Sequence, residues 1–121
     1  LITCLDLFAH IADDNAYLAA LDQLPHLCRH ECFLVTCDTV SDGQEQLHHH
    51  ADAHFTRWRQ IDQYRQALGR RGFMCVEDLV IHKDPQSRSS TRLFVFQYHD
   101  PVVDWMGHSR KQSSATTHPL P

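Results

Sequence analysis

The stretch Leu1-Ile-Thr-Cys-Leu-Asp-Leu-Phe-Ala-His-Ile-Ala-Asp-Asp-Asn-Ala-Tyr17 passes from an apolar segment to a helical one through a polar corner. Residues 1–8 are almost continuously apolar, which predicts a strand covered on both faces in a parallel sheet. Asp13 or Asp14 then supplies a carboxylate that caps the first turn of a helix, where backbone N–H groups lack partners. The corner from Asp6 to Asp13 therefore lies at the carboxyl end of a strand, where open α/β sheets bind their ligands.

The chain repeats this order of strand and helix. An amphipathic helix is expected over Asn15–Leu24, and Pro25 should interrupt it because proline removes an intrahelical donor. Cys32–Asp38 is a second apolar segment, typical of a central strand with both faces buried. The polar segment Asp38–Gln46 is expected to form a loop at the same edge of the sheet as the first corner.

The second half of the sequence predicts one more helix and two more strands. A helix is expected over Thr56–Arg70, since its apolar residues recur at helical spacing: Trp58, Ile61, Tyr64 and Leu68. Phe73–Ile81 and Arg92–Tyr98 have the composition of strands. The connection His82–Thr91 is too short and polar to hold a crossover helix, so these two strands should be antiparallel.

The order of these segments resembles the class I S-adenosylmethionine-dependent methyltransferases. The similarity rests on Leu-Asp-Leu-Phe-Ala-His-Ile-Ala-Asp at residues 5–13, and on Tyr-Arg-Gln-Ala-Leu followed by Gly-Arg-Arg-Gly-Phe at residues 64–73. It implies an α/β fold: a partial Rossmann-like methyltransferase sheet of about four strands, the last one antiparallel, with flanking helices. We assign residues 1–100 to this domain and interpret residues 101–121 as a disordered tail.

Two features of the family have no counterpart in the sequence: the Gly-rich first loop and the acidic residue after the second strand, which together hold most of the cofactor. The resemblance therefore implies only the carboxyl-terminal half of a methyltransferase. The expected function is methyl transfer from S-adenosylmethionine to an unidentified acceptor, as part of a longer chain. Most of the cofactor site would lie upstream of Leu1, and the 121 residues by themselves should be inactive.

The resemblance and the position of the corner together give five candidate site residues. Asp6 and Leu7 match positions that border the methionine end of the cofactor in the family. His10 lies on the same corner, and histidine is the side chain that enzymes most often use as a general base, so it is the candidate catalytic base or acceptor contact. Phe8 and Asp38 are the candidates for substrate binding. Structural roles remain open: His10 packing on the following helix, Asp6 binding backbone donors, and Asp38 as a solvated loop carboxylate.

Composition narrows the range of partners. The net charge of −4 with neutral histidines gives no indication of nucleic-acid binding. No apolar run reaches the roughly 18 residues needed to cross a membrane, so we expect a cytoplasmic protein. The methyl acceptor is unknown. An apolar edge at Leu1–Phe8, left exposed by the missing strands, would favour self-association.

Metal binding is an alternative function, since the sequence holds 11 histidines and five cysteines. His26, Cys28, His30 and Cys32 alternate, whereas structural zinc sites usually combine two close pairs of ligands separated by a gap. We therefore assign no metal ligand. The five cysteines are expected to be reduced and largely buried, since their number is odd and most lie next to apolar runs. A noncatalytic interaction module is the third hypothesis.

Overall fold

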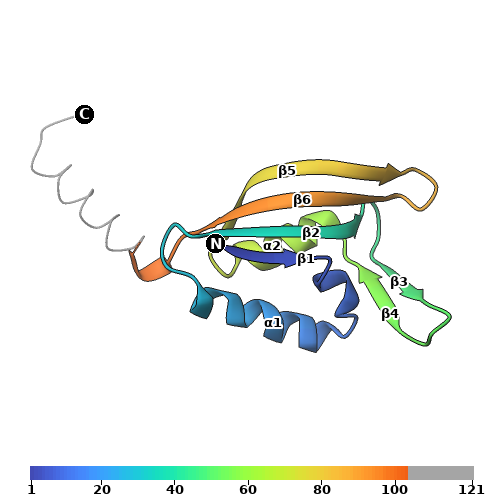
Figure 1. Cartoon of the computed structure of the whole chain (residues 1–121), viewed down its shortest axis with the longest axis horizontal. Helices are drawn as coiled ribbons and strands as arrows, with labels where there is room; N and C mark the ends of the chain where they lie inside the picture. Colours follow the sequence, from blue (N-terminus) through green and yellow to red (C-terminus); the bar gives the residue numbers. More distant parts are fainter. Residues whose placement is uncertain (104–121) are drawn as a thin grey trace, which may run out of the picture.

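The computed structural model describes residues 1–103. It contains a four-stranded sheet, two helices and a separate two-stranded hairpin (Figure 1). The elements in chain order are β1 (Ile2–Leu5), the 3-10 helix η1 (Phe8–His10), α1 (Asp14–Leu27), β2 (Phe33–Ser41), β3 (Gln46–His49), β4 (Phe55–Trp58), α2 (Ile61–Gly69), β5 (Phe73–Asp84) and β6 (Ser89–Tyr98). The predicted α/β class is therefore confirmed.

The strands of the large sheet are ordered β1-β2-β6-β5. β1 and β2 are parallel, with Ile2 opposite Leu34 and Leu5 opposite Cys37. β6 is antiparallel to both of its neighbours, β2 and β5. This confirms that the first two strands are adjacent and parallel and that the last strand is antiparallel. Among the described residues β1 pairs only with β2, so it is an edge strand of the sheet and not a central one.

One face of the sheet carries the core. Residues of β2 alternate between buried and partly exposed along most of the strand, and its buried Leu34 and Val40 share one hydrophobic cluster with residues of α1, α2 and β6. On the opposite face Phe33 and Leu79 remain 43% and 58% exposed. The prediction of strands covered on both faces is therefore wrong for residues 1–103, since both helices pack on the same side.

The first helix begins as the sequence predicts and ends later. Asp13 is its N-cap, and the Asp13 carboxylate accepts a hydrogen bond of 2.8 Å from the N–H of Ala16. The helix continues past Pro25 to Leu27. Because Pro25 lies in the final turn, its missing N–H removes one intrahelical bond without stopping the helix.

The segment after β2 differs most from the prediction. β2 continues into the segment that was expected to be a loop and ends at Ser41, which lies opposite Ser89 of β6. Residues 56–58, predicted to begin a helix, lie in β4 and pair with β3 in the hairpin. The helix α2 begins only after Gln60, whose side chain accepts a hydrogen bond of 2.9 Å from the N–H of Gln63. The pairing with β3 supplies backbone partners that override the helical spacing of the apolar residues.

Two further expectations concern the cysteines and the tail. Cys28 and Cys32 form a disulfide, with Cα atoms 5.8 Å apart, while Cys4, Cys37 and Cys75 are free. The expectation of five reduced cysteines is therefore wrong for one pair.

From residue 104 on, the predicted tail lies outside the described residues. Within residues 1–103, no helix has the length and apolar character that a membrane crossing requires.

Candidate functional site

The corner that follows β1 begins at Asp6, and Asp6 is bonded to the neighbouring strand β2. Asp6 adopts a left-handed backbone conformation with φ of 54°, which aspartate tolerates better than most residues. Its N–H donates a hydrogen bond of 2.6 Å to the carbonyl of Cys37 on β2. The chain therefore turns sharply away from the sheet at Asp6 and enters η1.

Asp6, Leu7 and His10 lie on the exposed side of the corner. The His10 Nε2 atom lies 3.3 Å from Oδ2 of Asp6, and the two side chains are 47% and 73% exposed. The ring centroid of His10 is 5.9 Å from that of His54, in the turn of the β3–β4 hairpin. The structure therefore brings two of the predicted site residues into contact and adds His54 beside them. Leu7 is 45% exposed and directly precedes η1.

Phe8 lies on the buried side of the same corner. Only 1% of it is exposed, and its ring meets Tyr17 edge-on at 6.0 Å and Tyr64 at 6.3 Å between centroids. These contacts place Phe8 in the hydrophobic core of the chain. The contact between Phe8 and an acceptor, which we predicted, remains a prediction.

Asp38 lies beneath the corner, and 2% of it is exposed. Its carboxylate accepts hydrogen bonds from the N–H of Ala9, at 3.2 Å, and from the hydroxyl of Tyr64, at 2.8 Å. Burial raises the pKa of Asp38 to about 6, although these hydrogen bonds oppose the shift. The space bordered by Phe8, Asp38 and Tyr64 has no room for a water molecule. In this chain Asp38 supports η1, and its predicted contact with an acceptor remains a prediction.

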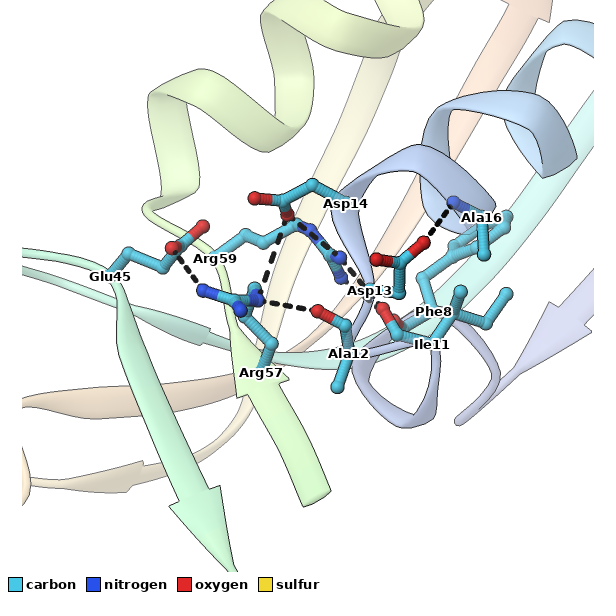
Figure 2. A network of polar contacts seen from close by, with 9 residues as sticks. All are labelled: Phe8, Ile11, Ala12, Asp13, Asp14, Ala16, Glu45, Arg57 and Arg59. Carbon is cyan, nitrogen blue, oxygen red and sulfur yellow. Dashed lines mark hydrogen bonds and ion pairs between the residues drawn. The ribbon is translucent and has the colours of Figure 1, made fainter. Parts of the chain in front are cut away.

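Arg59 holds the corner from the side of β4, as Figure 2 shows. Its guanidinium donates hydrogen bonds to the carbonyl of Phe8, at 2.9 Å, and to that of Ile11, at 2.7 Å. It also lies 3.3 Å from the carboxylate of Asp14 and stacks 3.5 Å above the ring centroid of Tyr17. The Arg59 residue is 5% exposed, and burial lowers the pKa of its guanidinium.

Arg57 adds a second set of contacts two residues earlier (Figure 2). It donates a hydrogen bond of 2.7 Å from Nε to the carbonyl of Ala12 and one of 2.8 Å to the carboxylate of Glu45. We call Arg57 and Arg59 the arginine clamp. Both lie within the segment Thr56–Arg70 that the sequence predicted to be helical, and neither was among the candidate site residues. Their spacing of two residues is the available signal, since it puts them on one side of a strand.

The hairpin turn concentrates histidine rings near the corner. His50 and His54 stack with centroids 4.3 Å apart, and His49 stacks on Phe55 at 4.6 Å. Within residues 1–103, no three histidine, cysteine or carboxylate side chains converge in a way that would hold a metal ion. The histidines of the hairpin instead contact other rings and neighbouring polar groups. His50, for example, forms a hydrogen bond of 2.9 Å with Thr56.

Comparison with known proteins gives structural matches and no sequence matches. No protein-family model and no curated protein matches the chain. Solved methyltransferases do match. The 1,6-didemethyltoxoflavin-N1-methyltransferase of Burkholderia thailandensis, with bound 1,6-didemethyltoxoflavin and S-adenosylhomocysteine (SAH), has a TM-score of 0.64 and 18% identity over 81% of this chain and 44% of its own.

Two further structures agree. A SAM-dependent methyltransferase from Methanosarcina mazei has a TM-score of 0.63 and 6% identity, over 80% of this chain and 57% of its own. The N-terminal domain of EvdMO1, solved in the presence of SAH and D-fucose, has a TM-score of 0.55 and 15% identity. The match covers 80% of this chain and 46% of the EvdMO1 chain. The chain therefore has the fold of class I S-adenosylmethionine-dependent methyltransferases, and it spans about half of the length of these three proteins.

Proposed function

We propose that this chain is the carboxyl-terminal half of a methyltransferase and supplies the acceptor side of its active site. The carrying observation is the overlap of the β1-β2-β6-β5 sheet with methyltransferases over only about half of their length. The corner after β1 carries the exposed groups Asp6, Leu7 and His10 at the carboxyl edge of this sheet, where ligands of open α/β sheets bind.

Asp6 and Leu7 border the methionine end of S-adenosylmethionine in this proposal. The glycine loop and the ribose-binding carboxylate belong to strands that precede β1 in the family. The chain by itself then contacts only a small part of the cofactor. The neighbours that hold SAH support the choice of cofactor, because two of the three were solved with it.

His10 is the proposed base. When Nε2–H of His10 donates to the Asp6 carboxylate, Nδ1 of the ring carries the free electron pair. Bound S-adenosylmethionine would supply a methyl group on a sulfonium, and transfer of that methyl group to the acceptor would release a neutral thioether. The acceptor proton moves to Nδ1 of His10. Because the leaving group needs no proton, one base and a good alignment of reactants are enough.

Isothermal titration with S-adenosylmethionine tests the proposal on two polypeptides: the 121 residues, and the same chain extended by its upstream coding sequence. Each lost charged hydrogen bond costs about 1.5–3 kcal/mol, so the short chain should bind several powers of ten more weakly. Micromolar binding by the short chain would refute the half-domain assignment. An extended chain that fails to bind would refute the methyltransferase assignment.

The role of His10 is tested in the extended chain by the substitution His10→Ala. We expect slower turnover with nearly unchanged affinity for S-adenosylmethionine. His26→Ala is the matched control, since His26 is an exposed histidine on α1, away from the corner. Turnover equal to that of the unsubstituted protein would assign His10 to a packing role on the corner.

A further inference from the structure

We propose that Arg57 and Arg59 are positioning residues, which lock the corner in the shape that presents Asp6 and Leu7 to the methionine end of the cofactor. This inference rests on the proposed function for its ligand. Neither arginine lies on the exposed side of the corner with Asp6 and His10, so both act through the backbone that they hold.

The corner needs such support because its own hydrogen bonds are few. η1 is a single turn with two internal bonds, from His10 N–H to the Leu7 carbonyl and from Ile11 N–H to the Phe8 carbonyl, each 3.1 Å long. A turn of this length is not stable by itself. The arginine clamp adds donors to the carbonyls of Phe8, Ile11 and Ala12. Three carbonyls of the corner are thereby held by Arg57 on β4 and by Arg59, which directly follows Trp58 at the end of β4.

The charges indicate that the clamp acts through geometry. Its two guanidinium groups face two carboxylates, those of Asp14 and Glu45, at distances of 2.8–3.6 Å. The positive charge is therefore balanced locally, and the clamp adds little field at the exposed side of the corner. The contribution of the clamp is therefore the planar arrangement of its N–H donors. The guanidinium of Arg59 alone donates to two carbonyls and one carboxylate. A lysine keeps the charge but has no such fork.

The clamp also connects the corner to the hairpin. β4 carries Arg57, and its preceding turn carries His54, whose ring lies beside His10. The hairpin therefore contacts the exposed side of the corner through His54 and a backbone carbonyl of the corner through Arg57. A molecule that displaces the hairpin would also displace the carbonyls that the clamp holds.

Hydrogen exchange of the 121-residue chain tests the structural step without any ligand. In Arg59→Lys and Arg57→Lys, the amides of Ala9, His10 and Ile11 should exchange about tenfold faster, while those of β2 and β6 keep their rates. Arg71→Lys is the matched control: Arg71 pairs with Asp22 at 2.7 Å and is 18% exposed in its side chain, against 22% for Arg57.

Two results of that experiment would overturn the inference. One is unchanged exchange at the corner in the folded variants. The other is an equal change at the corner and in β2 and β6, which would mean a general loss of stability. If Arg59→Lys fails to fold, the more exposed Arg57→Lys decides between these outcomes.

The ligand step is tested in the extended chain by comparing S-adenosylmethionine with adenosine, which lacks the methionine end. Each clamp variant should bind S-adenosylmethionine about tenfold more weakly and adenosine almost unchanged. An equal loss for both ligands would reject the positioning role. If the unsubstituted extended chain binds neither ligand, the proposed function fails, and hydrogen exchange still decides whether the clamp orders the corner.

Discussion

The hydroxyl of Tyr64 on α2 lies 2.8 Å from Oδ2 of Asp38 and 2.8 Å from Oγ1 of Thr36, both on β2. All three residues are at most 2% exposed. The other oxygen of Asp38 accepts the N–H of Ala9 in η1. One buried carboxylate therefore joins a helix, the sheet and the candidate site.

Asp38→Asn should change how stability depends on pH. The folded-state pKa of Asp38 is about 6, above its unfolded value of 3.8, so between about pH 4 and 6 the unfolded chain loses this proton first. Ionisation of Asp38 then lowers the stability of the folded chain by about 3 kcal/mol as the pH rises through this range. Asparagine does not ionise, so the variant lacks this decrease. Urea unfolding of both proteins at several pH values measures the difference.

The asparagine amide can still serve the same neighbours, because its oxygen accepts from Ala9 and its nitrogen donates to Tyr64, whose hydroxyl then donates to Thr36. Stability curves of the two proteins that run parallel from pH 4 to 7 would show that Asp38 is not the group responsible.

Tyr64→Phe removes the hydroxyl and leaves the Asp38 carboxylate with one donor fewer. Because this hydrogen bond lowers the pKa of Asp38, the variant should lose more stability at pH 7 than at pH 4. The expected loss near pH 7 is about 1–3 kcal/mol. Tyr98→Phe is the control. Tyr98, on β6, is a buried core tyrosine like Tyr64, but the hydroxyl that donates to Asp38 is that of Tyr64. Similar losses in both variants would indicate packing as the cause.

The free edge of β1 should promote association of the chain. Leu5 is 62% exposed, and β1 has no second neighbour among the described strands. Sedimentation velocity should show concentration-dependent oligomers that decrease in Leu5→Lys, because a charge on an edge strand opposes pairing. Leu27→Lys, at a residue 68% exposed on α1, is the matched control. Equal effects of the two substitutions would exclude the strand edge as the contact.

The chain is expected to purify without stoichiometric zinc. Two of the four alternating ligand candidates, Cys28 and Cys32, are joined in a disulfide and so cannot bind metal as thiolates. Elemental analysis after dialysis against a weak chelator measures the metal content. One zinc per chain that persists, and that disappears in His26→Ala with Cys28→Ser, would restore the metal hypothesis.

The sequence by itself determined the elements whose local signals agree with their tertiary surroundings. The apolar run before Asp6, the cap at Asp13 and the short polar connection between β5 and β6 predicted strand, helix and antiparallel pair, and all three are present. These features depend on hydrogen bonds and side-chain periodicity within a few residues, which a single sequence displays directly.

Only the tertiary structure decided the segment from β3 to α2 and the inner half of the site. Residues 56–58 were predicted to be helical, yet pairing with β3 placed them in a strand and turned Arg57 and Arg59 toward the corner. Those contacts join residues more than 40 positions apart. A local sequence pattern cannot predict which distant backbone carbonyls need a hydrogen-bond donor, because that depends on the tertiary packing of the chain.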